Sequence, residues 1–251
     1  MKKIAIIGGS GLEDPAILKD VNEITVDTPY GAPSSTFKCG KIDGVDVVIL
    51  SRHGRDHSIP PTLVNNRANI WAIKHLGCSC IIATTACGSL RLEIGRGEIV
   101  FPHQFIDFTR FRKSTFVESF ENGNLDHPAM SEPFSWKLRQ RLIENAKELD
   151  LGFHKTGTVI TIEGPRFSTR AESNMFRIWG ADVINMSTAP ECALANEVNL
   201  PYAAIALSTD YDSWNIDEAP VTWEEVLKVF NENVENVIQL LANTIASFKK
   251  E

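Results

Sequence analysis

Short apolar runs rich in β-branched residues recur along this chain, and stretches with helical character separate them. The runs cover residues 4–7, 47–50, 80–84, 98–101, 158–162, 182–185 and 203–207. Several show no polar–apolar alternation, which is typical of strands covered on both faces. Helices are expected at 65–75, 134–149 and 222–248, the last beginning with a Thr222–Glu225 capping box. This order predicts an α/β fold with a central mixed, mostly parallel sheet flanked by helices.

The composition is that of a globular chain long enough to bury a substantial core. No repeat, low-complexity tract or linker interrupts the 251 residues, so we expect a single domain over 1–251. The net charge of -7 argues against nucleic acid as a partner, because such a surface needs a clustered basic face. No window approaches 18 unbroken apolar residues, which argues against a membrane span. Five scattered cysteines fit reduced thiols in a cytoplasmic protein.

Polar motifs follow several of the apolar runs, at the edge where open α/β sheets bind their ligands. The first is the turn Gly8-Gly9-Ser10-Gly11. It lacks the third glycine of a dinucleotide fingerprint, since Asp14 occupies that position, and no Gly-Lys-Ser/Thr follows as in a Walker A loop. Taken alone, it also fits a tight turn that needs glycine for its backbone angles.

Two further motifs offer donors to an anion. Segment 51–57 follows one strand, and segment 84–89, rich in small residues, lies at the end of another. A solvated loop and a small-residue turn are the alternatives for each motif alone. A metal site is not expected, because no third ligand accompanies His53 and His57. The groups expected to converge on one small anion, without a diphosphate or magnesium, are those of Ser10, Arg52, His53, Thr85 and the Ala86 amide.

The segment 208–212, Ser-Thr-Asp-Tyr-Asp, places two carboxylates two positions apart. Alternate residues project to the same side of a strand, so Asp210 and Asp212 are expected side by side. If both are buried, one pKa rises, because two such groups cannot both ionise easily. A protonated acid beside an ionised one matches adenine, whose N7 accepts and whose 6-amino group donates a hydrogen bond. A solvated acidic loop is the alternative.

Two apolar side chains accompany these polar groups. Phe167, on a turn after a strand, could stack on a base, and Met186 could pack against a sugar. Ordinary core packing is the alternative for either residue taken singly.

Six segments resemble the trimeric purine nucleoside phosphorylases, and among them the 5'-methylthioadenosine phosphorylase branch. They are G-G-S-G-L at 8–12, S-R-H-G-R at 51–55, T-T-A-C-G-S-L at 84–90, T-I-E-G-P-R-F-S-T-R-A-E-S at 161–173, W-G-A-D-V-I-N-M-S at 179–187 and S-T-D-Y-D at 208–212. The resemblance covers nearly all of the chain. It implies a phosphorylase/hydrolase-like fold, a homotrimer, and phosphorolysis of a nucleoside with inorganic phosphate as co-substrate and nucleophile. It implies no metal or organic cofactor.

The resemblance also implies roles for individual positions. The phosphate site is similar to one formed by Ser10, Arg52, His53, Thr85, the Ala86 amide and Ser187. The nucleoside site is similar to one with Phe167 on the purine, Met186 at the ribose, Asp210 at N7, Asp212 at the 6-amino group, Val226 and Leu227 at the methylthio group, and His127 from a neighbouring subunit. The catalytic side chains would be Asp210 and His53. The products would be adenine and 5-methylthioribose 1-phosphate, in purine and methionine salvage.

Other functions remain as alternatives. A phosphorylase of 6-oxopurine nucleosides, acting on inosine, guanosine or methylthioinosine, would share the fold. A NAD-binding module predicts no cleavage at all, and a metal-dependent nucleoside hydrolase predicts an aspartate cluster that Asp14 and Asp20 do not form. Trp223 replaces a smaller apolar residue of the family pattern, and the sequence ends at Glu251, before a helix that closes the 5'-pocket in longer members. Adenosine and 5'-deoxyadenosine are therefore further candidate substrates.

Overall fold

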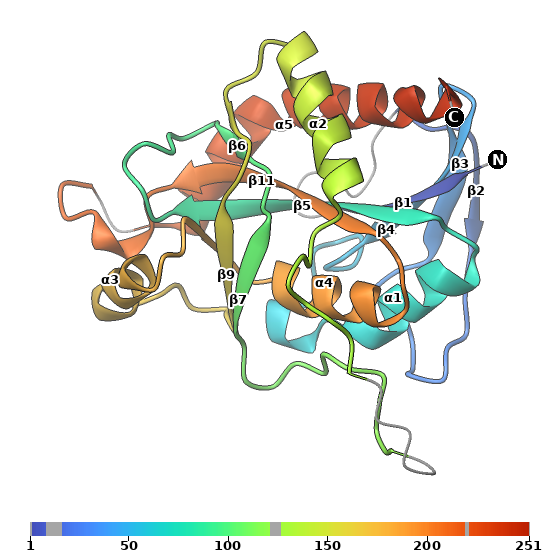
Figure 1. Cartoon of the computed structure of the whole chain (residues 1–251), viewed down its shortest axis with the longest axis horizontal. Helices are drawn as coiled ribbons and strands as arrows, with labels where there is room; N and C mark the ends of the chain where they lie inside the picture. The colour runs from blue at the N-terminus through green and yellow to red at the C-terminus, as the bar shows by residue number, and fades with distance from the viewer. Residues whose placement is uncertain (1, 9–16, 121–126, 219–220, 251) are drawn as a thin grey trace.

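The computed structural model describes residues 2–8, 17–120, 127–218 and 221–250. At the centre of its sheet, β1 (Lys3–Gly8) lies between β4 (Val45–Ser51) and β5 (Cys80–Ser89) and runs parallel to both. β11 (Tyr202–Asp210) runs parallel to β5 on its other side. These strands are almost entirely buried, as expected for parallel strands covered by helices on both faces (Figure 1).

The remaining strands extend this centre into a mixed sheet of eleven strands within the described residues. They are β2 (Lys19–Ile24), β3 (Phe37–Ile42), β6 (Ile99–Val100), β7 (Gln104–Phe108), β8 (Phe153–His154), β9 (Thr158–Ile162) and β10 (Val183–Asn185). β2 and β3 form an antiparallel edge beyond β4, and β10 pairs antiparallel with the end of β5 before β9 and β7 continue in parallel. The predicted α/β class and mixed sheet are confirmed.

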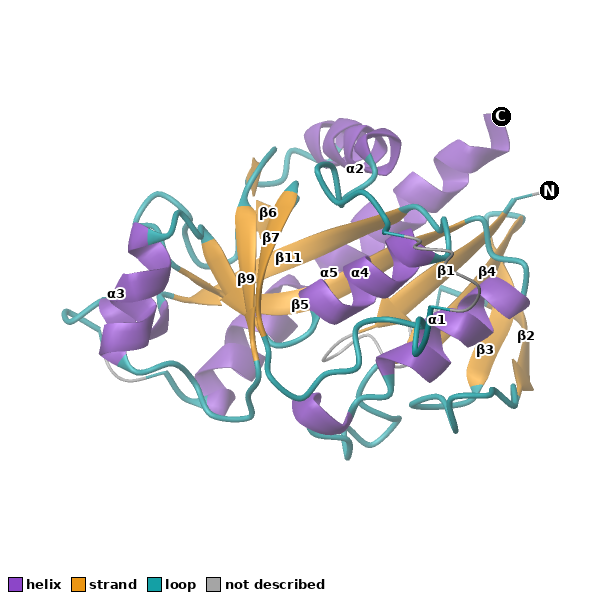
Figure 2. Cartoon of the chain, turned by 60° about the horizontal axis from the view of Figure 1, so that its bottom comes forward, coloured by secondary structure: helices purple, strands orange, loops and turns teal. Residues whose placement is uncertain are grey.

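Helices cover both faces of the sheet (Figures 1 and 2). α1 (Asn66–His75) and α4 (Thr188–Glu197) pack on one face, and α2 (Trp136–Glu148) and α5 (Trp223–Ala246) pack on the other. Strand alternation divides the core accordingly: Ala5 joins the cluster of α1 and α4, whereas its neighbour Ile4 joins that of α2 and α5. The short helix α3 (Arg170–Ile178) packs against a third, smaller cluster.

The three helices expected from the sequence are present, with ends set by capping residues. The Asn65 side chain accepts a hydrogen bond from the Ala68 amide at the start of α1. Thr222 caps α5 by accepting from the Glu225 amide at 3.3 Å. The reciprocal capping box occurs instead at the start of α3, between Thr169 and Glu172. None of the described helices is both long and apolar enough to cross a membrane.

The segment 84–89, which the sequence analysis places at the end of a strand, forms the second half of β5. β11 continues to pair with it as far as Gly88, across an irregularity between Ser208 and Asp210. The alternative of a small-residue turn does not hold, because the partner strand supplies the backbone hydrogen bonds of this segment. The hydroxyls of this segment therefore stand on a rigid strand rather than on a loop.

Candidate active site

One cavity of about 750 Å³, its mouth included, opens at the carboxyl ends of the central strands. The ends of β4, β5, β10 and β11 and the start of α5 contribute to its walls. Open α/β sheets bind their ligands in this position. The described residues that line it are Arg52, His53, His57, Pro61, Thr85, Ala86, Cys87, Gly88, Ile162, Phe167, Ile184, Asn185, Met186, Ser187, Thr209, Asp210, Asp212, Trp223 and Val226.

Two buried acids, Asp210 and Asp212, stand next to one another in this cavity. Asp210 ends β11 and accepts hydrogen bonds from the Asp212 amide at 2.8 Å and from the Thr209 hydroxyl at 2.9 Å. Asp212 begins the short turn η3 (Asp212–Trp214) with a φ of 46°, and it accepts from the Ser168 hydroxyl at 2.6 Å. The acids are adjacent as predicted, but the predicted reason is wrong. The chain turns after Asp210, so strand alternation does not place Asp212.

Burial raises the pKa of both acids. For Asp210, the hydrogen bonds from the Asp212 amide and from Thr209 oppose this rise, and the charge of Asp212 adds to it. For Asp212, the hydrogen bond from the Ser168 hydroxyl opposes the effect of burial. Loss of hydration, rather than repulsion within the pair, is thus the main cause. Each acid holds a proton to a higher pH than a carboxyl group in water does.

Gly88 allows β5 to approach the acid pair closely. A Cβ atom at this position would lie 2.8 Å from Oδ1 of Asp210, 3.1 Å from Cγ2 of Ile184 and 3.2 Å from Cβ of Asp212. The first of these distances is shorter than real Cβ contacts. A side chain here would therefore displace Asp210.

Arg52 approaches the cavity from the end of β4, which β1 and β5 separate from β11. It is buried, and its Nη1 donates to the Thr84 carbonyl at 2.9 Å. Its Nε and Nη2 donate to the Glu191 carboxylate on α4, the latter at 3.1 Å. Glu191 is fully buried and also accepts from the Tyr202 hydroxyl at 2.8 Å. The arginine predicted to hold an anion is thus already paired with one carboxylate.

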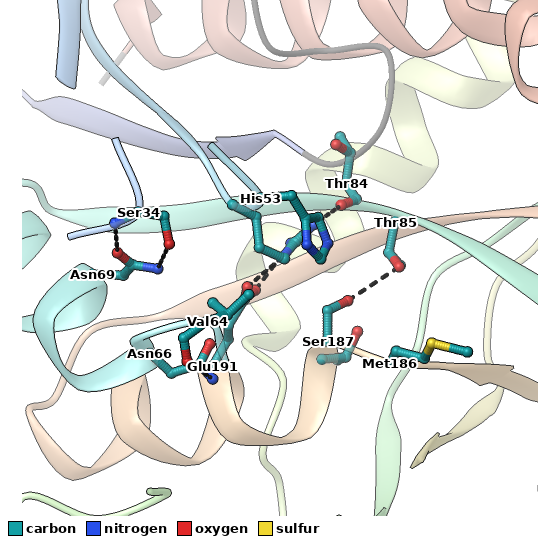
Figure 3. A network of polar contacts seen from close by, with 12 residues as sticks. Ser34, His53, Val64, Asn66, Asn69, Thr84, Thr85, Met186, Ser187 and Glu191 are labelled. Atoms are coloured by element: carbon teal, nitrogen blue, oxygen red, sulfur yellow. Dashed lines mark hydrogen bonds and ion pairs between the residues drawn. The ribbon is translucent and has the colours of Figure 1, made fainter. Parts of the chain in front are cut away.

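Two hydroxyls face each other beside this ion pair. Oγ1 of Thr85 on β5 lies 3.2 Å from Oγ of Ser187 (Figure 3). Ser187 is the N-cap residue of α4, yet its side chain makes no capping hydrogen bond. The side-chain amide of Asn185 donates to the Thr85 hydroxyl at 3.3 Å and to the Thr188 hydroxyl at 2.5 Å. With the positive end of the α4 dipole, these hydroxyls suit a small anion.

A row of three rings forms another part of the wall. The ring centroids of His53 and His57 are 4.6 Å apart, and those of His57 and Trp223 are 5.5 Å apart. Nδ1 of His53 lies 2.9 Å from the Ile59 carbonyl. A carbonyl only accepts, so this contact assigns a hydrogen to Nδ1. Trp223 begins α5, so the row connects the loop after β4 with that helix.

The cavity brings together most of the residues assigned from the sequence: Arg52, His53, Thr85, Ala86, Phe167, Met186, Ser187, Asp210, Asp212 and Val226. Leu227, half-buried on α5, is not among the described residues that line it. His127 is exposed in a separate surface hollow, with its ring 5.6 Å from that of Phe120. Ser10 lies outside the described residues. No three His, Cys, Asp or Glu side chains of the described chain are grouped to hold a metal ion.

Nearly the whole chain matches a known protein family. A model described as the phosphorylase superfamily matches residues 3–246. The chain belongs to the phosphorylase superfamily. This confirms the family that the six segments of the sequence resemble.

Individual relatives of this phosphorylase are similar over nearly their whole length. The S-methyl-5'-thioadenosine phosphorylase of Xenopus tropicalis is 53% identical over 246 residues, covering 97% of this chain and 88% of that protein. The one of Danio rerio is 52% identical over 245 residues, with the same coverage.

Solved structures agree with this family and with the fold. Methylthioadenosine phosphorylase from Schistosoma mansoni in complex with adenine has a TM-score of 0.94 at 41% identity, covering 100% of this chain and 93% of that chain. A mutant of the adenosine/methylthioadenosine phosphorylase from the same organism, in complex with methylthioadenosine, has a TM-score of 0.92 at 40% identity, with the same coverage.

The site of this phosphorylase also contains residues that the sequence analysis did not single out. Glu191 pairs with Arg52, Tyr202 donates to Glu191, and Ser168 donates to Asp212. One signal was available for Glu191, because it is the only charged residue in the stretch 188–196. A lone charge within a largely uncharged stretch of nine residues indicates a buried partner. Nothing in the local pattern distinguishes Tyr202 or Ser168 from ordinary core residues.

Proposed function

We propose that this protein cleaves the N-glycosidic bond of 5'-methylthioadenosine with inorganic phosphate, producing adenine and 5-methylthioribose 1-phosphate. One observation carries the proposal: a single cavity contains a buried acid pair, an arginine and two hydroxyls at a helix N-terminus. The acid pair suits an aminopurine, and the arginine and hydroxyls suit phosphate. The names of relatives that share about half of this sequence support the choice of substrate.

The acid pair would select a 6-aminopurine. In the proposed arrangement Asp210 is protonated and donates to N7, while Asp212 is ionised and accepts from the 6-amino group. A 6-oxopurine presents an acceptor at both positions, so an ionised Asp212 would repel it. Phe167, which is partly exposed at the cavity wall, would stack on the ring.

The proposed reaction moves the sugar from purine N9 to a phosphate oxygen. As the C1'–N9 bond breaks, its electron pair moves into the purine, and Asp210 neutralises the leaving group by giving a proton to N7. A phosphate oxygen forms the new bond to C1', and the phosphate charge stabilises the cationic sugar in between. The groups proposed to hold phosphate are those of Ser10, Arg52, His53, Thr85, the Ala86 amide and Ser187.

The rest of the cavity would hold the sugar and its 5'-substituent. Met186 would pack against the ribose. Val226 is buried and lines the cavity near the helix start that carries Trp223, so both would contact the methylthio group. Leu227 would act behind Val226, since it does not line the cavity wall itself.

We further propose that the protein is a cytoplasmic homotrimer whose residues 1–251 form one nucleoside phosphorylase domain, acting in purine and methionine salvage without a metal or organic cofactor. His127 is exposed and away from the cavity of its own chain. This position would let it reach the 5'-end of the site in a neighbouring subunit. Light scattering should therefore give three times the mass of one chain. His127→Ala should weaken binding of methylthioadenosine more than binding of adenine.

The main test is product analysis with methylthioadenosine, adenosine and inosine, each with and without phosphate. We expect adenine from methylthioadenosine, and only when phosphate is present. Faster release of hypoxanthine from inosine would favour the 6-oxopurine reaction instead. Cleavage that persists without phosphate would indicate a hydrolase.

A further inference from the structure

A second ion pair, with a buried arginine and a partly buried glutamate, lies beside the cavity without lining it. Nε of Arg112 lies 2.8 Å from Oε1 of Glu163, and its Nη2 donates to the Glu163 carbonyl at 2.6 Å. The Arg112 side chain is 1% exposed although it lies in a connection after β7 rather than in a helix or strand. A charged side chain is buried this fully in a loop only if its partners hold it there.

The Glu163 carboxylate collects further donors from two connections. Its Oε2 accepts from the backbone amides of Arg110 at 2.7 Å and Phe111 at 3.1 Å, and its Oε1 accepts from the Thr62 hydroxyl. Partial burial opposes ionisation, but these bonds and that from Arg112 lower the pKa of Glu163 to about 2. The pair therefore stays charged at any physiological pH.

The third bond of Arg112 reaches the wall of the cavity. Its Nη1 donates to the Met186 carbonyl at 3.1 Å. The residue after Glu163 contacts the same methionine, because a Cβ on Gly164 would lie 2.4 Å from Sδ of Met186. Arg112 thus holds the backbone of Met186, and Gly164 lies against its side chain. The next residue, Ser187, carries one of the hydroxyls proposed to hold phosphate.

We propose that Arg112 is a positioning residue for phosphorolysis. It holds the peptide between Met186 and Ser187 in the orientation that fixes the position of the ribose subsite relative to the phosphate subsite. Glu163 is the counter-charge of Arg112. Arg112 is not a catalytic residue, because it does not line the cavity. The proposal rests on the proposed function, which assigns ribose to Met186 and phosphate to Ser187.

The planar guanidinium is essential to this role. Three acceptors in different directions bond to its Nε, Nη1 and Nη2. A lysine ammonium could keep the charge pair with Glu163, but as a single compact group it does not match this fork. Arg112→Lys should therefore preserve much of the stability while it frees the Met186 carbonyl.

The test compares Arg112→Lys and Arg112→Gln with the wild type. We would measure kcat and KM for methylthioadenosine and for phosphate, together with the Kd of adenine by calorimetry. A misplaced subsite should lower kcat/KM about 100-fold in both variants. The Kd of adenine should not change, because Asp210, Asp212 and Phe167 hold the base and none of them bonds to Arg112.

Arg91→Gln is the matched control. Like Arg112, Arg91 donates to both a carboxylate and a backbone carbonyl: to Asp182 at 3.0 Å and to the Arg177 carbonyl at 3.3 Å. Neither acceptor belongs to a residue that lines the cavity. The turnover of Arg91→Gln should stay near that of the wild type. Normal turnover in Arg112→Lys, or a loss of adenine affinity as large as the loss of activity, would overturn the positioning role. A wild-type protein that binds adenine but does not cleave methylthioadenosine would overturn the proposed function instead.

Discussion

The carboxylate of Glu191 and the guanidinium of Arg52 form an ion pair inside the protein, with 0% and 2% of their side chains exposed. The pair leaves this part of the cavity with little net charge. Phosphate would therefore be held by a paired arginine, by hydroxyl groups and by the α4 dipole, rather than by an isolated cation. This arrangement allows the charge to be buried before the substrate arrives.

Removing the charge of Glu191 should destabilise the protein and make its stability more dependent on phosphate. In Glu191→Gln, Arg52 remains buried without its counter-charge, which should lower the free energy of unfolding by about 3–5 kcal/mol. Phosphate should then raise the denaturation midpoint more in the variant than in the wild type, because it supplies the missing negative charge. The control is Tyr202→Phe, which removes one neutral hydrogen bond worth about 1 kcal/mol. Equal stability of Glu191→Gln and the wild type would contradict this account.

Asp210→Asn should fold normally and lose most of its turnover. The amide can still donate a hydrogen bond to N7 but cannot transfer a proton to it. We expect kcat to fall about 100- to 10,000-fold, the usual contribution of a general acid, with a smaller change in KM. Steady-state kinetics with methylthioadenosine would measure this. Asp150→Asn is a suitable control, since Asp150 is exposed and has a φ of 51° that asparagine tolerates. Near-normal kcat in Asp210→Asn would exclude Asp210 as the acid.

The same substitution should change how stability depends on pH. Burial raises the pKa of Asp210, so the folded state binds this proton more tightly than the unfolded state does. The resulting stability is fully present below the unfolded pKa and is lost as pH rises through the folded pKa. The side-chain amide of the variant does not titrate. The stability of Asp210→Asn relative to the wild type, measured by urea unfolding, should therefore increase as the pH rises above the pKa of an unfolded aspartate, about 4. Parallel stability curves for the two proteins would be evidence against a raised pKa.

Trp223 should contribute to the choice of 5'-substituent. Its ring lies 5.5 Å from that of His57 and lines the cavity, where a thioether could contact the aromatic faces. Such sulfur–aromatic contacts are worth about 0.3–1.5 kcal/mol, so Trp223→Val should lower kcat/KM for methylthioadenosine about 2- to 10-fold. The value for adenosine should change less. Trp136→Val, at an exposed position on α2, controls for the loss of a tryptophan. An equal effect on both substrates would remove Trp223 as a selective residue.

Gly88→Ala should impair catalysis by displacing Asp210. The new Cβ would come within 2.8 Å of its carboxylate, and both residues stand on paired strands that cannot easily separate. We expect weaker adenine binding together with reduced turnover. Gly152→Ala is the control, because its nearest contacts of 3.5 and 3.6 Å are ordinary. Unchanged adenine affinity in Gly88→Ala would show that the acid pair accommodates the methyl group.

The strands formed by continuous apolar runs were the most predictable part of the fold. The runs at 4–7 and 47–50 became β1 and β4, because strands covered on both faces need apolar residues at every position. The edge strands β2 and β3 were missed for the opposite reason. β2 is almost wholly exposed and carries lysine, aspartate and asparagine, so only its pairing with β3 makes it a strand.

Helices α3 and α4 were also missed, although their sequences carry local signals. Thr169 followed by Glu172 is a capping box in the sequence, and the structure forms it. The sequence of α4 carries a weaker helix signal, since its first turn contains Pro190 and its residues are buried on almost all sides. Such a helix lacks the polar face by which helices are recognised in a sequence.

The sequence by itself determined the fold class, the family and the identity of most side chains that meet in the cavity, because these follow from local patterns and from motifs with fixed spacing. Only the tertiary structure decided how those side chains are paired. Glu191 lies 139 positions after Arg52 in the chain, and Arg112 reaches Met186 across 74 positions. Contacts between such distant residues depend on how strands and helices pack, and packing is a property of the whole chain rather than of any segment of it.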